Sequence, residues 1–156
     1  INVQGDEPEI DPDNIDFLAR MLEENPDAPM ATLGAGFQKT EQVQDPNAVK
    51  VIRDSNGRAI YFSRSVIPYA RDEQGVGGLD LYMRHLGIYA YRKEFLLKIT
   101  YLPRTKLEKC EKLEQLRALE NGYSILLGEV EHRSEGIDTP EQYAEFVTRY
   151  QQHKKD

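Results

Sequence analysis

The chain has 156 residues and a mass of 18.0 kDa, which is the size of one domain with a sizeable core. It carries 27 acidic and 20 basic residues, a formal net charge of -7 and an isoelectric point near 5.1. This balance is the opposite of what a nucleic-acid binder needs, and no apolar run approaches the roughly 20 residues of a membrane span. The single cysteine excludes an internal disulfide and a multi-cysteine zinc site. We therefore expect a cytoplasmic globular protein with no nucleic-acid partner.

Apolar spacing and turn residues predict strands that alternate with helices along the chain. The predicted strands cover residues 1–4, 30–33, 49–52, 59–62, 86–91 and 123–130. The predicted helices cover residues 11–25, 93–101, 107–120 and 140–150. Alternation of this kind favours a single α/β domain with a mixed, mainly parallel sheet covered by helices.

The clearest local signal is a hairpin. Val49 to Ile52 and Ala59 to Phe62 flank the pair Asn56-Gly57, which supplies the positive φ angles of a tight turn. The residues that follow, 64–84, have weak periodicity and contain three glycines. Connections of this length inside a compact domain usually serve function or assembly.

The last predicted helix has a strong start signal. Residues 139–142 form a Thr-Pro-Glu-Gln capping box with proline at the first helical position. Its apolar stripe is expected to pack in the core and consists of Tyr143, Phe146, Val147 and Tyr150.

Two acidic residues stand near predicted strand ends. Asp6 follows the first strand and a glycine, and Asp138 lies just before the capping box. Ligands of open α/β sheets gather beyond the carboxyl ends of strands, so the two carboxylates can share a cleft and bind Mg²⁺, with water and phosphate oxygens completing its shell. The alternative is that Asp6 caps a turn and Asp138 favours the adjacent helix N-terminus. Spacing leaves both interpretations open.

The predicted helix over 107–120 carries charges on its apolar face. Glu114 lies four residues after Cys110, and Arg117 intrudes on the same stripe. A charge on a core face is costly unless it is paired. Either Glu114 and Arg117 form a pair, or this face opens onto a polar ligand with Gln115 beside it. Cys110 itself is expected to be an inert core residue.

Other polar residues are ambiguous from the sequence alone. His85 begins a predicted strand and Arg64 ends the hairpin, and each is either an ordinary structural or surface group or a ligand contact. Lys50, Arg53 and Arg58 are expected on the solvent face of the hairpin.

Six segments, in order, resemble motifs of the bacterial 3-deoxy-manno-octulosonate cytidylyltransferases, which attach CMP to 3-deoxy-manno-octulosonate (Kdo). They read VQGDEP at 3–8, DPNAVKV at 45–51, YFSR at 61–64 with IP at 67–68, RHLGIY at 84–89 with YR at 91–92, LE at 107–108 with LEQLR at 113–117, and GIDTPE at 136–141. Together these segments span nearly the whole chain.

The resemblance implies a Rossmann-like nucleotidyltransferase fold and a homodimer with a β-rich dimerisation segment, which residues 47–92 would supply. It also implies the reaction of CTP with Kdo, which gives CMP-Kdo and pyrophosphate for lipopolysaccharide synthesis. In that reaction the anomeric hydroxyl of the sugar attacks the α-phosphorus, while Mg²⁺ neutralises charge on the phosphates.

The resemblance further implies roles for individual residues. Asp6 and Asp138 match the family's catalytic, magnesium-binding aspartates. The residues that match substrate-contacting positions, most of them around Kdo, are Gln4, Arg64, His85, Tyr89, Glu114 and Gln115. Among these, Arg64 and His85 suit the sugar carboxylate, because charge-assisted hydrogen bonds are about twice as strong as neutral ones.

Three features depart from the family pattern. The glycine- and basic-rich loop that cradles the CTP triphosphate has no counterpart, so we interpret residues 1–156 as the later portion of one cytidylyltransferase domain that does not turn over CTP by itself. Glu135 is added beside Asp138, and residues 103–107 replace a shorter turn. These departures keep open another sugar acid, such as 8-amino-Kdo or a sialic acid, or a non-catalytic module that retains the fold.

Overall fold

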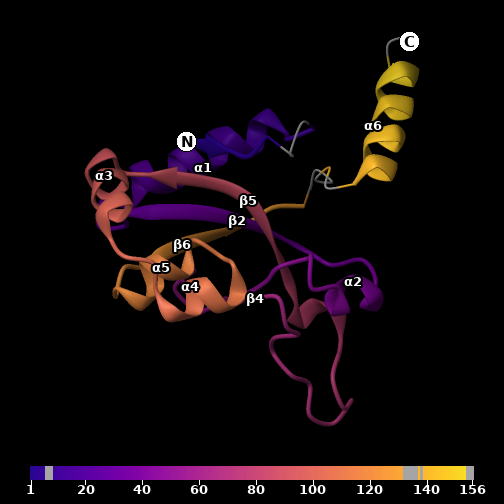
Figure 1. The fold of residues 1–156 in the computed structure, drawn as a ribbon, viewed down its shortest axis with the longest axis horizontal. Helices are drawn as coiled ribbons and strands as arrows, with labels where there is room; N and C mark the ends of the chain where they lie inside the picture. The colour runs from indigo at the N-terminus through magenta and orange to yellow at the C-terminus, as the bar shows by residue number, and fades with distance from the viewer. Residues whose placement is uncertain (6–8, 132–136, 138, 154–156) are drawn as a thin grey trace.

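The computed structural model describes residues 1–5, 9–131, 137 and 139–153 (Figure 1). Within these ranges the strands are β1 (Asn2–Val3), β2 (Met30–Gly36), β3 (Lys50–Arg53), β4 (Ala59–Ser63), β5 (Met83–Tyr91) and β6 (Ile125–Glu129). The helices are α1 (Pro12–Glu24), α2 (Thr40–Gln44), α3 (Lys93–Tyr101), α4 (Lys106–Glu111), α5 (Leu116–Glu120) and α6 (Pro140–His153), with a 3₁₀ turn η1 (Leu79–Leu81). None of the helices in the described ranges is long and apolar enough to cross a membrane.

The strands form one sheet in the order β4-β3-β5-β2-β6, and β1 pairs with β5. In the described part of the chain, β2 and β6 run parallel and every other pairing is antiparallel. The predicted mixed α/β sheet is therefore confirmed, but the prediction that it is mainly parallel is wrong. The strand–helix alternation suggested crossover connections, whereas β5 runs antiparallel to all three of its neighbours.

Helices cover both faces of the sheet (Figure 1). On one face α1 packs through Leu18 and Leu22 onto β2, β5 and β6. On the other face α5 contributes Leu116, which is buried with Phe62 of β4 and Phe95 of α3. The sheet thus has an apolar core on each side, as expected for an α/β domain.

Local sequence signals account for the best-predicted elements. Asp11 caps α1, accepting a hydrogen bond from the Asp13 N–H at 2.9 Å, and Pro12 is at the first helical position. The β3–β4 hairpin turns at Gly57, whose φ of 73° favours glycine. Both elements are confirmed where the sequence predicted them.

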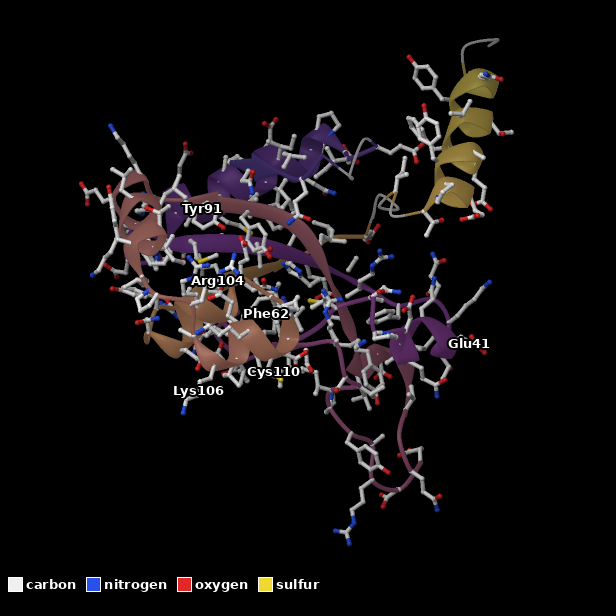
Figure 2. The ribbon with its side chains drawn as sticks, viewed as in Figure 1. Glu41, Phe62, Tyr91, Arg104, Lys106 and Cys110 are labelled. Carbon is white, nitrogen blue, oxygen red and sulfur yellow. The ribbon has the colours of Figure 1, made fainter. Side chains whose placement is uncertain are left out.

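The predicted helix over 107–120 is two short helices. The chain leaves α4 at Lys112, which has a left-handed φ of 57°, and enters α5 at Leu116. Cys110 is exposed on α4 (Figure 2), so its predicted core position is wrong. The helical period was counted across a break that has neither glycine nor proline to mark it.

The apolar stripe of α6 does not join the core. The helix lies apart from the sheet (Figure 1), and Tyr143 and Tyr150 are 58% and 52% exposed. Their rings pack against Phe146 within the helix. Helical periodicity identified the amphipathic face correctly but says nothing about what covers it.

The connection between β4 and β5 extends away from the sheet (Figure 1). It includes η1 and a short antiparallel bridge between Ala70 and Gly75. At its base, Tyr82 packs with Phe37 and Val43 in a third apolar cluster.

Candidate active site

A cavity of about 610 Å³ opens beside β5. One edge of β5 pairs with β2 along its length, so β1 and β3 share the opposite edge. There β3 pairs with Met83 and Arg84, whereas β1 pairs with Ile88 and Tyr89. The cavity lies where β5 changes from one partner to the other.

The cavity brings together all six residues that the resemblance assigns to substrate binding. They come from five separate places in the chain: the end of β1, the end of β4, two positions of β5 and the turn between α4 and α5. The six are Gln4, Arg64, His85, Tyr89, Glu114 and Gln115.

The two predicted magnesium ligands, Asp6 and Asp138, lie outside the described residues. Described residues near both of them in the chain, Gln4 and Thr139, line the same cavity.

The Gln4 side chain, which lines the cavity, packs against β5 at Gly87. A Cβ atom at Gly87 would lie 2.7 Å from Gln4 Oε1, well inside van der Waals contact. Glycine at position 87 therefore gives the Gln4 side chain its space beside β5.

A β-bulge shapes the strand beside this position. The register of β2 against β5 shifts between Thr32, opposite Tyr89, and Leu33, opposite Leu86. Bulges of this kind redirect side chains and are common next to active sites. Here the bulge brings the hydroxyl of Thr32 within 2.7 Å of the Ile88 carbonyl oxygen and 2.9 Å of His85 Nε2.

His85 is a neutral imidazole. Burial lowers the pKa of His85 to about 3, and the positive charge of Arg84 contributes in the same direction. Phe62 meets the His85 ring edge-on at 5.0 Å, and the Tyr89 ring lies 5.3 Å away. In the free protein, burial among Phe62 and Tyr89 therefore disfavours the charged form of His85.

The two tyrosines in the cavity also stay neutral at ordinary pH. Burial raises the pKa of Tyr89, and it raises the pKa of Tyr91 to about 12. Their rings stack at 5.9 Å, and Tyr91 lies toward the α3 end of the strand (Figure 2). Both hydroxyls can thus donate as well as accept hydrogen bonds.

Arg64 is held in place by neutral groups. Its Nε donates to the Glu111 carbonyl oxygen at 2.8 Å and its Nη1 to the Pro46 carbonyl oxygen at 3.0 Å. The Glu111 carboxylate accepts instead from the Arg64 backbone N–H at 3.0 Å and from the Ser63 hydroxyl at 2.7 Å. Among the described residues no carboxylate forms a salt bridge with the guanidinium, so its charge is available to an anion in the cavity.

The turn between α4 and α5 presents polar groups to the cavity. Arg117 pairs with Glu108, not with Glu114, through bonds of 2.9 Å and 2.5 Å. The proposed Glu114–Arg117 pair is therefore wrong, and Glu114 is an exposed carboxylate at the cavity. Beside it, Gln115 is 5% exposed and its buried Nε2 has no hydrogen-bond partner among the described residues.

Lys50 is fully buried, which corrects its predicted place on the solvent face. Its Nζ donates to the carbonyl oxygens of Asp45 and Ala48 at 2.8 Å and 2.7 Å. Burial lowers the pKa of Lys50, although the Asp45 charge opposes this shift. Strand alternation was misleading because the loop before β3 folds back over the face that carries Lys50.

Sequence reasoning did not assign several cavity residues. These are Asn2, Asp45, Asn47, Val49, Arg84, Gly87, Tyr91, Lys112, Leu113 and Thr139. Most lie inside or beside the quoted motifs, so a wider reading of those motifs would have found them. Thr32, by contrast, gives no signal, because a threonine in an apolar strand is unremarkable.

The comparisons with known proteins agree with this geometry. Residues 1–129 match the model of a family described as cytidylyltransferase. The chain belongs to that family. It is 46% identical over 153 residues to a 3-deoxy-manno-octulosonate cytidylyltransferase of Rhodopirellula baltica, and 49% identical over 146 residues to one of Syntrophotalea carbinolica.

A solved structure is also similar. It is that of CMP:2-keto-3-deoxy-manno-octonic acid synthetase complexed with CTP, and it matches with a TM-score of 0.88 and 36% identity over 97% of this chain. The likeness confirms the Rossmann-like nucleotidyltransferase fold. This chain spans 61% of the length of that protein. The alignment with the Rhodopirellula baltica relative covers 96% of this chain and 61% of the relative. The alignment with the Syntrophotalea carbinolica relative covers 90% of this chain and 58% of the relative.

Proposed function

We propose that the complete protein transfers CMP from CTP to the anomeric hydroxyl of Kdo, giving CMP-Kdo and pyrophosphate. The new bond joins the sugar oxygen to the α-phosphorus, the bond from that phosphorus to pyrophosphate breaks, and the hydroxyl proton is released. The observation that carries the proposal is that all six residues assigned to the substrate line one cavity. The relatives named for this reaction support it.

The chemistry of the cavity suits a sugar acid. The guanidinium of Arg64 is fixed by two carbonyl oxygens and is in no salt bridge among the described residues, so it provides a partner for the carboxylate. Glu114 and the Gln115 amide, which both line the cavity, can bind hydroxyl groups, which accept and donate hydrogen bonds. A neutral His85 with a pKa of about 3 is a weak base, so we assign it to substrate binding and not to removal of the hydroxyl proton.

We propose Asp6 and Asp138 as the residues that hold Mg²⁺. Carboxylates are the ligands this ion prefers, and Gln4 and Thr139, close to them in the chain, line the substrate cavity. When bound, the ion would neutralise charge on the phosphates and the leaving pyrophosphate.

We also propose a cytoplasmic homodimer whose product serves lipopolysaccharide synthesis. The connection between β4 and β5 lies within residues 47–92, the segment expected to dimerise. It exposes Tyr69 by 66% and Leu81 by 52%. Apolar side chains on a projecting segment suit burial against a second copy.

Pyrophosphate release by the complete protein, supplied with CTP and Mg²⁺, tests the proposal. Kdo is expected to support turnover far better than 8-amino-Kdo or a sialic acid. A preference for either of the others identifies a different sugar acid. Binding of CTP without pyrophosphate release from any of the three indicates a non-catalytic module.

A further inference from the structure

The hydrogen bonds around Thr32 determine which nitrogen of His85 carries its proton. A threonine hydroxyl has one hydrogen to donate and two lone pairs to accept with. The oxygens of Ile88 and Leu86 near it, at 2.7 Å and 3.3 Å, are carbonyls and can only accept. The Thr32 hydrogen is therefore directed to Ile88, which is the nearer of the two.

The contact between Thr32 and His85 then has one consistent direction. Because the hydroxyl hydrogen is already used, the oxygen must accept from His85 Nε2 across 2.9 Å. This requires a proton on Nε2. The imidazole is neutral, so Nδ1 carries no proton. Among the described residues Nδ1 has no hydrogen-bond partner.

We propose that Thr32 is a positioning residue, which holds His85 as the Nε2–H tautomer and thereby offers Nδ1 to the cavity as a hydrogen-bond acceptor. The β-bulge lies at this position, and both the Leu86 and the Ile88 carbonyl oxygens are within 3.3 Å of the Thr32 hydroxyl. An acceptor at this position selects a donating group of the ligand and disfavours a carboxylate. For the identity of the ligand, a sugar acid that donates a hydroxyl, the inference rests on the proposed function.

The first test needs no substrate. In the complete protein with ¹⁵N-labelled histidine rings, NMR separates protonated from unprotonated ring nitrogens, and His85→Asn assigns the signals. We expect a protonated Nε2 and an unprotonated Nδ1 near neutral pH. Thr32→Val removes the hydroxyl and is expected to give a mixture of tautomers, whereas Thr32→Ser keeps the wild-type pattern. A protonated Nδ1 in the wild type, or an unchanged pattern in Thr32→Val, would overturn the proposal.

The second test adds Kdo. Binding is expected to shift the Nδ1 signal, and Thr32→Val is expected to raise the KM for Kdo about tenfold, or about 1.4 kcal/mol, with little change for CTP. Thr148→Val, which also loses a hydroxyl bonded to a carbonyl oxygen, is the matched control and should change neither. Bound Kdo that leaves the Nδ1 signal unmoved overturns the acceptor role. If no sugar acid binds, the proposed function fails together with the acceptor role, while the free-protein spectra still decide the role of Thr32.

Discussion

The Glu108–Arg117 contact and the turn between α4 and α5 are close in the chain, but their polar groups have different surroundings. Behind the turn between α4 and α5, Glu108 is 4% exposed and is bonded to Arg117 through two hydrogen bonds. In the turn itself, Glu114 and Gln115 face the cavity, and the buried Gln115 Nε2 has no partner among the described residues. The Glu108–Arg117 contact is therefore of the kind that stabilises the fold, whereas Glu114 and Gln115 are placed to contact a ligand in the cavity.

The same contrast extends to the sheet. Lys50 is buried and bonded to two carbonyl oxygens, which secures the loop that carries Asp45 and Asn47 into the cavity. Within the described part of the chain, His85 has a hydrogen bond at one ring nitrogen, Nε2, to Thr32. Lys50 thus supports the cavity through bonds to the backbone, whereas His85 lines it with one ring nitrogen bonded to Thr32.

The largest expected effect is on the acid stability of the fold. The folded pKa of His85 is about 3 against an ordinary value of 6.5. Between these values the unfolded chain binds a proton that the folded protein does not, so stability falls as the pH falls through this window, by on the order of 4 to 5 kcal/mol in all. Hydrogen bonds from Arg117 lower the pKa of Glu108 below its ordinary value of 4.5. The stability that Glu108 contributes is therefore lost only when the pH falls below that value.

Urea unfolding at a series of pH values, at fixed protein concentration, measures this pH dependence of the unfolding free energy. Wild type is expected to lose about 1.4 kcal/mol per pH unit below the ordinary histidine pKa. His85→Asn should lack this slope at the upper end of the window, where Glu108 does not yet titrate. Equal slopes for the two proteins would show that His85 is not kept neutral by the fold.

The second expected effect is loss of stability in Arg117→Leu. This substitution leaves the buried carboxylate of Glu108 without its partner, which is expected to cost about 3 kcal/mol of unfolding free energy in urea titrations. The double variant Glu108→Met with Arg117→Leu removes both charges and should recover most of the loss. If Arg117→Leu is as stable as wild type, the contact between Glu108 and Arg117 does not stabilise the fold.

Much of the fold could be predicted because its signals are local. The cap at Asp11, the Asn56-Gly57 turn and the helix from Lys93 to Tyr101 each depend on a few adjacent residues. Strand direction could not be predicted in the same way, because it depends on how β5 meets partners far away in the chain. The break at Lys112 was missed because a left-handed lysine leaves no mark in the sequence.

The site was predictable through its motifs, but the states of its groups were not. The resemblance placed Arg64 and His85 together correctly, since both line the cavity. It could not show that aromatic neighbours keep His85 neutral, or that Thr32 orients it. Burial and hydrogen bonding arise from tertiary packing, so the charge of a cavity group cannot be predicted without the structure.

The third effect is on substrate binding with stability unchanged. Glu114 is exposed and in no salt bridge among the described residues, so Glu114→Gln is expected to alter unfolding free energy by less than about 0.5 kcal/mol. Replacing a charge-assisted hydrogen bond with a neutral one should raise the KM for Kdo roughly tenfold. Glu94→Gln, on the exposed side of α3, is the matched control. A large loss of stability in Glu114→Gln would remove the distinction between the turn and the contact behind it.

The smallest effect is expected at Gln115, where ligand binding and stability should respond in opposite directions. Gln115→Leu keeps a similar volume and removes the buried Nε2 donor that has no partner among the described residues. Because an unsatisfied buried donor costs free energy, the variant is expected to equal or slightly exceed wild type in urea unfolding. The KM for Kdo should rise several-fold, since the Gln115 side chain lines the cavity, while Gln44→Leu on exposed α2 leaves it unchanged. A destabilised variant with normal KM would mean that the Gln115 amide supports the fold, and that the cavity does not reserve it for a substrate.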